Sequence, residues 1–464
     1  MEVNSYLFAA TPSSAYTVQS ELRLASWFAN AQYDYANKYY LSASLRADGS
    51  SRFADGHRWA TFWSAGAKYR ISEEKFFEPL KSIITNASIR SSFGTSGNQE
   101  VGTGYYASQY LFGYGYNYNS KPGMALEQFG NEELKWETTE KFNIGFDLQL
   151  IDRVNISFDY YNHNTKDMVF EVPLSFTTGM SSIYQNVGKL NNHGLEFAID
   201  ANLYKSKDIS WNVSFNASRN WNEVKKLSTD FPIEGSTQIT EVGKPIYQWF
   251  MKEYAGVNPE NGNAQWYLYG SKDEVPEGAD PNETTESYAK AGKRYLGSAN
   301  PKWQGSFGTQ LNAYGFNLSL QFNFSTGAKI YGNNLRYDCH TGGSFYEAWT
   351  QYVYDNRWQK PGDITTVPAL QTDGSSADKA SSRFLMDGDY LKFRSLSLGY
   401  TLPSNIVKKA GMSKVRVFMD AENLYTWTAK NYIGMDPAGV GANGSQWWNY
   451  PQARSFLFGI QVGF

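Results

Sequence analysis

Aromatic side chains gather in three stretches of this sequence, and their chemistry suits the binding of sugars. The stretches contain, in order, Tyr105, Tyr106, Tyr114 and Tyr116; Trp266, Tyr267 and Tyr269; and Trp447 and Trp448. Flat rings can stack on the apolar C–H face of a sugar while neighbouring Asn, Asp and Gln side chains bind its hydroxyls. Aromatic residues are also enriched at protein interfaces, so packing between loops or contact with a partner protein explains the same clusters.

The titratable residues give no indication of catalysis or of a resident metal. Glu73 and Glu74 are adjacent, so their carboxylates point apart on an extended backbone, and no Ser/His/Asp arrangement accompanies them. Cys339 is the single cysteine and adjoins His340, but no second cluster of ligands completes a zinc site. We therefore expect no enzyme, no catalytic residue, no metal ligand and no cofactor.

The distribution of charge indicates neither a nucleic-acid surface nor a calcium loop of known spacing. The 464 residues carry a net charge of -3, and no basic stripe stands out. An acidic run between Lys272 and Glu286 is most simply a solvated loop, and its spacing fits no EF-hand. We expect no nucleic-acid partner, and calcium binding in this loop stays an open alternative.

β-Strands must position these residues, because apolar and polar residues alternate along the whole chain. Residues 209–218 alternate without exception, and residues 453–464 end the chain as a strand with Phe456, Phe458 and Phe464 on one face. Aromatic residues make up 17% of a chain whose mean hydropathy is -0.53. A transmembrane β-barrel reconciles the two values, because only alternate residues of its strands face lipid.

Thirteen stretches are predicted to be strands of this barrel. They are residues 24–35, 40–46, 58–70, 83–95, 142–150, 154–160, 195–203, 209–218, 303–311, 316–324, 390–402, 415–425 and 453–464. The alternation breaks phase near Arg394, which predicts a β-bulge there.

Long and short connections alternate between the predicted strands. Short connections are expected at residues 36–38, 151–153, 204–207 and 312–314, with moderate ones at 72–82 and 403–413. Longer ones are expected at residues 96–133, 171–185, 222–300, 325–389 and 427–452, with a brief one at 48–57. Transmembrane barrels have short periplasmic turns and long extracellular loops, so the sequence predicts an all-β, antiparallel, up-and-down barrel in the outer membrane.

The predicted strands do not make a complete barrel. Thirteen is odd, whereas single-chain bacterial barrels have an even number of strands, and residues 1–14 lack the features of a signal peptide. We therefore expect the chain to be part of a longer protein. Residues 1–19 are then the tail of an extracellular loop, and residues 20–464 form the barrel portion.

Short motifs along the chain resemble the C-terminal part of SusC/RagA-like TonB-dependent outer-membrane transporters. They are SLRADGSSRF (44–53), FGTSGNQ (93–99), LKWE (134–137), NVGKLNNHGLE (186–196), GKPI (243–246), NPKW (300–303), DYLKFR (389–394), LGYTLP (398–403) and ENLYTW (422–427). Each motif alone is weak, but together and in order they are specific and cover about residues 20–464.

The resemblance implies a fold and a function. The family's barrel has 22 strands around a plug domain, so this chain would supply roughly the last thirteen. The plug domain, the TonB box and the signal peptide have no counterpart here. The parent protein would import oligosaccharides, or alternatively peptides, with a SusD-like surface lipoprotein and the TonB complex as partners and outer-membrane lipid around it.

The resemblance also gives each strand face a role. The apolar face, with Trp211, Phe215, Phe316 and Phe322, would meet lipid. The polar face would line the lumen and the plug, through Asn143, Asp147, Glu196, Asp200, Asn212, Asn216, Asn317, Gln321, Asp420 and Glu422. Support of the plug and hydration explain these polar residues more simply than direct substrate contact does. A passive porin and a surface-exposed β-rich glycan-binding module remain as alternatives of other classes.

Overall fold

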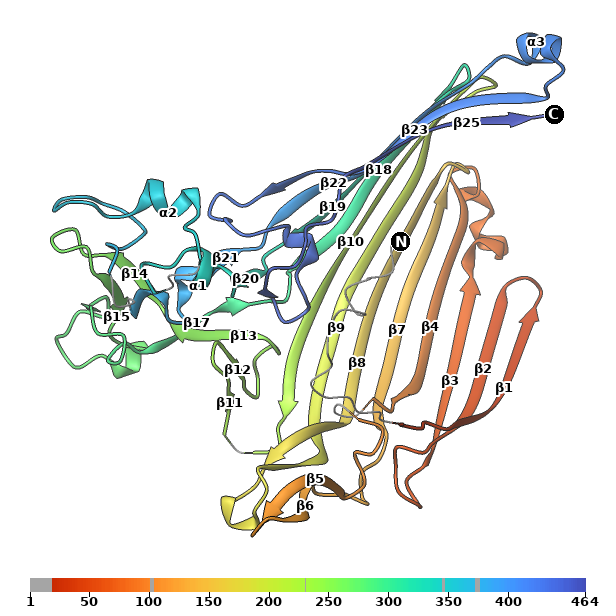
Figure 1. Cartoon of the computed structure of the whole chain (residues 1–464). Helices are drawn as coiled ribbons and strands as arrows, with labels where there is room; N and C mark the ends of the chain where they lie inside the picture. The colour runs from red at the N-terminus through yellow and green to blue at the C-terminus, as the bar shows by residue number, and fades with distance from the viewer. Residues whose placement is uncertain (1–18, 101–103, 230, 344–346, 372–375) are drawn as a thin grey trace.

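A computed structural model describes residues 19–464, except residues 101–103, 230, 344–346 and 372–375. The predicted loop tail, residues 1–19, therefore lies almost wholly outside the described residues. The main feature is one large, strongly twisted sheet, from one side of which a set of loops and small sheets projects (Figure 1). Within the described residues, no helix is long and apolar enough to cross a membrane.

The large sheet has thirteen strands, and each strand pairs antiparallel with its neighbours. The strands are β1 (Leu24–Tyr35), β2 (Tyr39–Ser50), β3 (Trp59–Arg70), β4 (Ile84–Asn98), β7 (Glu137–Leu150), β8 (Val154–Pro173), β9 (Ser182–Lys205), β10 (Ile209–Lys226), β18 (Trp303–Ala313), β19 (Phe316–Thr326), β22 (Tyr390–Thr401), β23 (Lys414–Thr428) and β25 (Ser455–Gly463). Their order in the sheet follows the sequence. This is the up-and-down meander that the alternation predicted, with a strand at each of the thirteen predicted stretches.

Tight turns and long loops lie at opposite ends of the sheet (Figure 1). In the turn after β1, Ala36 and Asn37 have φ of 53° and 58°, and Ile151 and Asp152 after β7 have φ of 46° and 56°. Positive φ at both central residues gives a type I′ turn, whose twist matches that of the two strands it joins. Strand β25 ends at the same side as these turns, as the parity of the connections predicted.

One connection is shorter than the sequence indicated. Residues 171–185 were expected to form a long loop, but the ladder between β8 and β9 continues to the pair Pro173–Ser182. Alternation of apolar and polar residues fades beyond residue 160, where the polar residues Asn162, His163 and Asn164 stand on both faces of the strand. The backbone hydrogen bonds do not depend on that alternation, so the hairpin extends past the apolar band.

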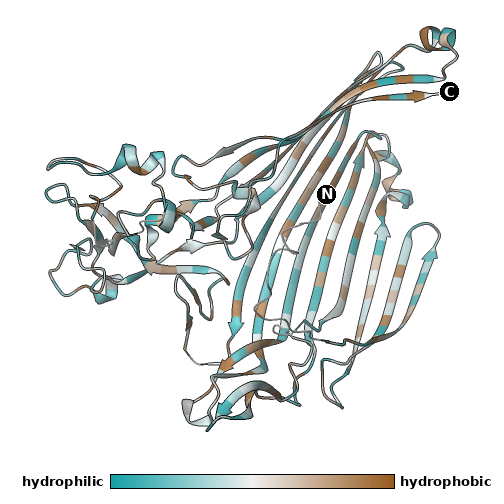
Figure 2. Cartoon of the chain, in the orientation of Figure 1, coloured by the Kyte–Doolittle hydropathy of each residue, from teal (hydrophilic) through white to brown (hydrophobic). Residues whose placement is uncertain are grey.

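The two faces of the sheet differ in chemistry, as the banding of hydropathy along the strands indicates (Figure 2). On one face, aromatic rings stack from strand to strand: Phe307 lies 4.9 Å from Phe322, and Phe322 lies 4.6 Å from Phe393, between ring centroids. Phe215 and Phe324 stack on the same face at 6.3 Å. Stacked, partly exposed phenyl rings on a continuous sheet face are typical of a surface that meets lipid.

A β-bulge interrupts β22 at Arg394, as the break in alternation predicted. Gln321 and Phe322 of β19 pair with Ser395 and Phe393, so Arg394 has no direct partner on that strand. The extra residue shifts the phase of the strand and keeps Phe393 on the aromatic face. Arg394 also donates a hydrogen bond to the Asn423 side chain of β23.

The sheet is open at both ends of its strand order. Among the described residues, β1 pairs only with β2 and β25 pairs only with β23. The expectation that the strands do not make a complete barrel is therefore confirmed. Unpaired backbone N–H and C=O groups in hydrocarbon cost several kcal/mol each, so both edges need further strands in a membrane.

The connections contain small strands and helices of their own, which the sequence did not reveal. The strands are β5 (Leu111–Tyr118), β6 (Lys121–Gln128), β11 (Ile233–Glu234), β12 (Gln238–Thr240), β13 (Gln248–Lys252), β14 (Tyr254–Val257), β15 (Ala264–Tyr267), β16 (Thr284–Thr285), β17 (Lys293–Ser298), β20 (Lys329–Gly332), β21 (Leu385–Asp387) and β24 (Ser445–Gln446). The short helices are α1 (Leu335–Asp338), α2 (Gln351–Asn356) and α3 (Ser404–Val407). All of these lie in the outward loops except α3, which lies at the other end of the sheet, between β22 and β23 (Figure 1).

The best-buried large side chains of the molecule lie mainly in these loops rather than on the large sheet. Trp249 and Tyr331 are fully buried, with ring centroids 5.7 Å apart, and Met251, Val353 and Phe384 pack in the same cluster. Two of these residues come from the loop between β10 and β18, and three come from the loop between β19 and β22. A shared apolar core therefore fixes these two loops to each other.

Candidate functional site

The third aromatic stretch forms an exposed platform with a residue from a different loop. Trp447 and Trp448 are 46% and 50% exposed, with ring centroids 6.0 Å apart. Tyr337 of α1 lies 5.3 Å from Trp448, and the indole Nε1–H of Trp448 donates to Asp338 Oδ1 at 3.0 Å. We call Tyr337, Trp447 and Trp448 the aromatic platform. It presents half-exposed ring faces beside a carboxylate, which is a combination that suits a sugar.

The platform is held by the pairing of two loops. Strand β24, which immediately precedes Trp447, pairs parallel with β20, so that Ser445 lies beside Tyr331. Gln446 is buried, and its side-chain oxygen accepts a hydrogen bond from the Met435 amide at 3.0 Å. Burial raises the pKa of the Tyr331 hydroxyl and keeps it neutral. The rings of the platform therefore project from a backbone that is fixed on its inner side.

A buried ion pair fixes the segment that follows α1. Arg383 and Asp378 are 5% and 15% exposed in their side chains, and a guanidinium nitrogen lies 3.1 Å from Asp378 Oδ1. The same carboxylate accepts from the backbone and hydroxyl of Thr341, and Arg383 donates to the Cys339 carbonyl at 2.8 Å. Burial raises the pKa of the Cys339 thiol. The thiol is buried, with 3% exposure, and lies 3.5 Å from the Thr350 hydroxyl.

The second aromatic stretch serves mainly to pack its own loop. Trp266 is 1% exposed and meets Tyr288 edge to face at 5.4 Å. The guanidinium of Arg294 lies over the Tyr267 ring at 4.2 Å, and the Tyr269 hydroxyl donates to Glu283 at 3.1 Å. For Trp266, the structure favours packing, because a buried indole offers no face to a ligand.

The first aromatic stretch divides between two environments. Tyr114 and Tyr116 lie on β5, in a hairpin that projects from the loop after β4, and are 84% and 49% exposed. The Arg52 guanidinium lies over the Tyr105 ring at 5.0 Å, and the Tyr106 hydroxyl accepts from the Glu21 amide at 2.9 Å. The β5 pair therefore presents the freer rings of this stretch.

The acidic run forms a folded loop around one carboxylate. Glu286 accepts hydrogen bonds from the side-chain amides of Asn258, Asn261 and Asn263 at 2.7, 3.0 and 2.9 Å. These donors lower the pKa of Glu286. Among the described residues, no group of three or more His, Cys, Asp or Glu side chains could hold a metal ion.

The carboxylate pair considered for catalysis has a structural role at the turn end of the sheet. Glu74 accepts from Lys38 Nζ at 3.0 Å and from the Tyr39 hydroxyl at 3.2 Å. The hydrogen bond from Lys38 lowers the pKa of Glu74. Glu73 lies 3.7 Å from Arg70. Both carboxylates thus join the turn between β3 and β4 to neighbouring basic groups.

The residues predicted for the polar face lie on five strands of the large sheet. They are Asn143 and Asp147 on β7, Glu196 and Asp200 on β9, Asn212 and Asn216 on β10, Asn317 and Gln321 on β19, and Asp420 and Glu422 on β23. Several are linked across strands: Asn212 donates to Asp200 at 2.9 Å, and Asn216 donates to Ser306 at 2.7 Å. These cross-strand hydrogen bonds pair the side-chain amides of the polar face with acceptors on the neighbouring strands.

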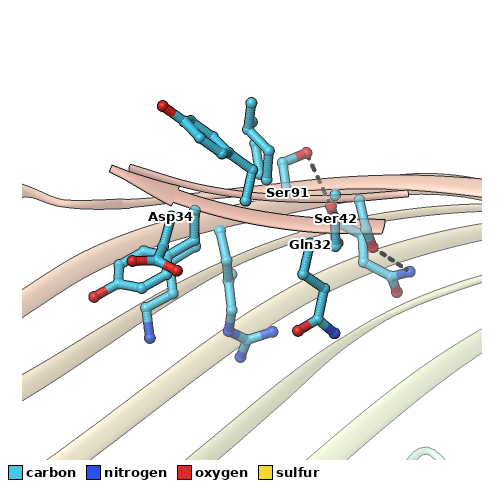
Figure 3. Close-up of a pocket in the computed structure, with 14 residues that line it drawn as sticks. Gln32, Asp34, Ser42 and Ser91 are labelled. Atoms are coloured by element: carbon cyan, nitrogen blue, oxygen red, sulfur yellow. Dashed lines mark hydrogen bonds between the residues drawn. The ribbon is translucent and has the colours of Figure 1, made fainter. Parts of the chain in front are cut away.

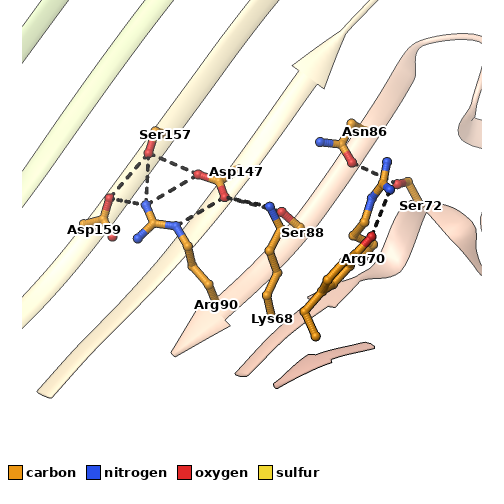
Figure 4. Close-up of polar contacts among 10 residues, drawn as sticks. Lys68, Arg70, Ser72, Asn86, Ser88, Arg90, Asp147, Ser157 and Asp159 are labelled. Carbon is orange, nitrogen blue, oxygen red and sulfur yellow. Dashed lines mark hydrogen bonds and ion pairs between the residues drawn. The ribbon is translucent and has the colours of Figure 1, made fainter. Parts of the chain in front are cut away.

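An ion-pair network crosses four neighbouring strands on this face (Figure 4). Arg90 of β4 lies 3.2 Å from Asp147 of β7 and 2.6 Å from Asp159 of β8, and Lys68 of β3 lies 3.9 Å from Asp147. Ser157 donates to Asp147 at 3.2 Å. Sequence reasoning singled out only Asp147, although Arg90 and Asp159 stand at polar positions of predicted strands and could have been found by the same alternation.

A pocket of about 330 Å³ lies on the polar side of the first strands, beside this network. Its lining includes Gln32 and Asp34 of β1, Ser42 of β2 and Ser91 of β4, which are labelled in Figure 3. Lys68 and Arg90 also line it. The pocket therefore carries both signs of charge among apolar lining atoms and adjoins the open edge at β1.

Comparison with known proteins identifies the fold. The family model described as TonB dependent receptor-like, beta-barrel matches residues 4–424. TonB-dependent receptor P3 of Formosa agariphila is 30% identical over 96% of this chain and 46% of that protein. TonB-dependent receptor SusC of Bacteroides thetaiotaomicron is 28% identical over 95% of this chain and 44% of that protein. The chain spans about half the length of the curated relatives it matches.

Solved structures agree with these relatives. The structure of the RagAB peptide transporter superposes with a TM-score of 0.84 and 28% identity, over 96% of this chain and 48% of that chain. A structure of the RagAB peptide importer in an open-open state gives the same TM-score and identity over 98% of this chain and 48% of that chain. The predicted resemblance to SusC/RagA-like barrels and the predicted partial barrel are confirmed.

The family membership also bears on location and class. TonB-dependent receptors of this type lie in the outer membrane and are not enzymes, so the predicted location and the prediction that the chain is not an enzyme are confirmed. A soluble β-rich glycan-binding module is set aside, because the thirteen-stranded sheet matches a membrane barrel over nearly its whole length. The chain belongs to the TonB-dependent receptor-like β-barrel family and is of the SusC/RagA-like type.

Proposed function

We propose that residues 20–464 form the C-terminal part of the wall, and the outward loops, of an energy-coupled outer-membrane importer. The observation that carries this proposal is the open thirteen-stranded meander, whose two free edges require further strands. The relatives are about twice as long, which supports a parent protein with the remaining strands. A plug and a contact with the TonB complex belong to that remaining part.

The substrate that we propose is an oligosaccharide, captured by the outward loops under a SusD-like lipoprotein. The aromatic platform supports this choice, because Trp447 and Trp448 keep about half of their surface free beside Asp338. Tyr114 and Tyr116 on the β5–β6 hairpin offer a second set of free rings. The remaining predicted residues, Tyr105, Tyr106, Tyr267 and Tyr269, would contact substrate only through the parts of their rings left free by loop contacts.

A peptide is the second candidate substrate. The RagAB proteins, which are described as a peptide transporter and importer, superpose on this chain with a TM-score of 0.84. Exposed Trp and Tyr rings bind peptide side chains as well as sugars. The similarity to RagAB also supports a SusD-like lipoprotein over the outward loops, whether the substrate is an oligosaccharide or a peptide.

We propose that the polar face lines the lumen and supports the plug. The network of Arg90, Asp147 and Asp159 supports this role, because its charges pair with each other rather than with a transported solute. The pocket beside it has room for polar groups of a plug at the wall. Direct contact with substrate is the alternative for these residues.

An uptake experiment in cells tests the proposal. Cells that carry the full-length parent should accumulate a labelled oligosaccharide mixture, and a protonophore should abolish the accumulation because TonB coupling needs the proton gradient. Replacement of the platform indole, Trp448→Ala, should weaken substrate binding about tenfold, as expected for a central aromatic contact. Tyr314→Ala is the matched control, since Tyr314 is an exposed ring in a turn at the opposite end of the sheet.

The outcomes separate the candidate functions. Accumulation of labelled peptides but not of oligosaccharides would replace the proposed substrate with a peptide. Equilibration that is insensitive to the protonophore would indicate a passive porin. An equal loss of binding in the Trp448 and Tyr314 variants would remove the aromatic platform from the site.

A further inference from the structure

An arginine stands on the aromatic, lipid-facing side of the sheet, where cations are rare. Arg219 of β10 pairs with Leu195 of β9, two residues beyond the pair Ala217–Phe197. The register is regular from Asn212 to Val224. Alternate residues of a strand share a face, so Arg219 lies on the same face as Phe215.

The height of Arg219 places it at the outer boundary of the apolar band. Trp211 and Trp221 share this face of β10 and are ten residues apart. Ten residues of strand span about 33 Å, and a tilt of about 40° reduces this to about 25 Å, the height of the apolar band of such barrels. Trp211 lies near the tight turn after β9, and Trp221 lies toward the outward loops. Arg219, two residues before Trp221, therefore lies about 5 Å inside this boundary, a depth from which its long side chain reaches the outer-leaflet headgroups.

The guanidinium of Arg219 lies beside two indoles. Its Cζ is 4.5 Å from the centroid of Trp221 and 5.6 Å from that of Trp303 on β18. His193 of β9 stacks on Trp221 at 5.5 Å, with planes 9° apart. Tryptophan prefers the membrane interface. The π-faces of the two indoles hold the guanidinium at the sheet surface. Its N–H groups stay available to the surroundings.

No anion of the described part of the protein satisfies Arg219. Among the described residues, no hydrogen bond or ion pair reaches its guanidinium, and its neighbours on β10 bond elsewhere. Two other cations farther out on the same face do have carboxylate partners: Lys166 lies 2.6 Å from Glu140, and Lys225 lies 2.7 Å from Glu223. Arg219 thus carries an unbalanced charge at the level where the sheet leaves the apolar band.

We propose that Arg219, Trp221 and Trp303 form a site for a phosphate group on the headgroup of an outer-leaflet lipid. The planar fork of arginine matches phosphate in a bidentate geometry, and a cation at the membrane surface attracts anionic lipid. The site is continuous with the apolar face of β10 and β18, where Phe215 pairs with Phe307. The acyl chains of the same lipid lie against these two rings.

The test measures lipid bound to the full-length protein extracted from its own outer membrane. The protein is exchanged into mild detergent, incubated with lipid A or with dephosphorylated lipid A, and examined by native mass spectrometry. We expect retention of lipid A, and Arg219→Gln should lower that retention about fivefold, which is the effect of one interfacial cation. Dephosphorylated lipid A should be retained equally weakly by both proteins.

Two further variants keep the result decisive. Arg153→Gln removes an exposed arginine in the tight turn at the opposite boundary of the sheet and should retain lipid A as the unmodified protein does. Arg219→Lys keeps the charge and should retain an intermediate amount. Resistance of each protein to unfolding in cold detergent shows that the barrel is intact. Equal retention by the unmodified protein and Arg219→Gln, or an equal loss in Arg153→Gln, would overturn the proposal.

Discussion

At the scale of single residues, the sequence shows the chemistry of a side chain but not its surroundings. Trp266 and Trp448 both stand in aromatic stretches of outward loops, and nothing local distinguishes them. One is 1% exposed and packs against Tyr288, whereas the other is 50% exposed. The difference arises from contacts between segments far apart in sequence. For that reason the candidate residues could be predicted from their type, but their accessibility could not.

The Asp378–Arg383 pair gives a prediction at this scale. Asp378→Asn removes the charge that balances a guanidinium with 5% exposure, and removing one partner of a buried pair costs about 3–5 kcal/mol. We expect this loss in the local free energy of opening of the loop between β19 and β22. Hydrogen exchange of amides near Thr341 measures it.

An exposed ion pair provides the control for this prediction. Asp55 is 88% exposed in its side chain and lies 2.8 Å from Arg58. Asp55→Asn should change stability by less than about 1 kcal/mol, as exposed pairs generally do. If Asp378→Asn also stays within that margin, the ion pair does not fix the loop.

At the scale of elements, period-two alternation predicted the strands of the large sheet and even the bulge at Arg394. This works because one face of each strand must be apolar along the whole band. Except for β5 and β6, the small strands of the loops escaped prediction because they have only two to six residues and lie in a compact assembly with no lipid-facing side. The pairing of β20 with β24 is also parallel and joins two different loops, which no local pattern encodes.

The last strand gives a prediction about strand packing. A Cβ at Gly459 of β25 would lie 2.3 Å from Cζ of Phe418 on β23, so the phenyl ring covers the glycine backbone. Gly459→Ala should therefore destabilise the protein by about 1–3 kcal/mol through overpacking, as measured by thermal unfolding in detergent. The double variant with Phe418→Leu should recover part of this loss. Equal stability of Gly459→Ala and the unmodified protein would show that the ring moves away freely.

At the scale of the whole molecule, the sheet is a wall with one face for lipid and one for polar contacts. Exposed aromatic rings such as Phe215 and Phe458 lie on one side, and the network around Asp147 lies on the other (Figure 4). The alternation predicted this division. The arrangement of the loops beside the wall depends on their shared core around Trp249 and could not be predicted.

The depth of each strand in the membrane can be tested directly. Phe215→Arg places a cation near the middle of the apolar band and should cost about 2–4 kcal/mol, whereas Trp211→Arg near the boundary should cost less than about 1 kcal/mol. Both residues belong to β10 and line the same apolar hollow. Reversible unfolding from lipid vesicles measures the two costs. A smaller cost at Phe215 than at Trp211 would contradict the assigned depth.

The parallel pairing of β20 with β24 also limits how the loops can be exchanged between relatives. Residues 327–389 supply one strand of this pair, and residues 429–454 supply the other. The amides of Tyr331 and Asn333 donate to the carbonyls of Gly444 and Gln446 at 2.9 and 2.8 Å. A graft of either segment alone would mismatch the two backbones and leave these buried amides unpaired. Chimeric receptors built to change specificity should therefore carry both segments from the same donor, as a single transplantable unit.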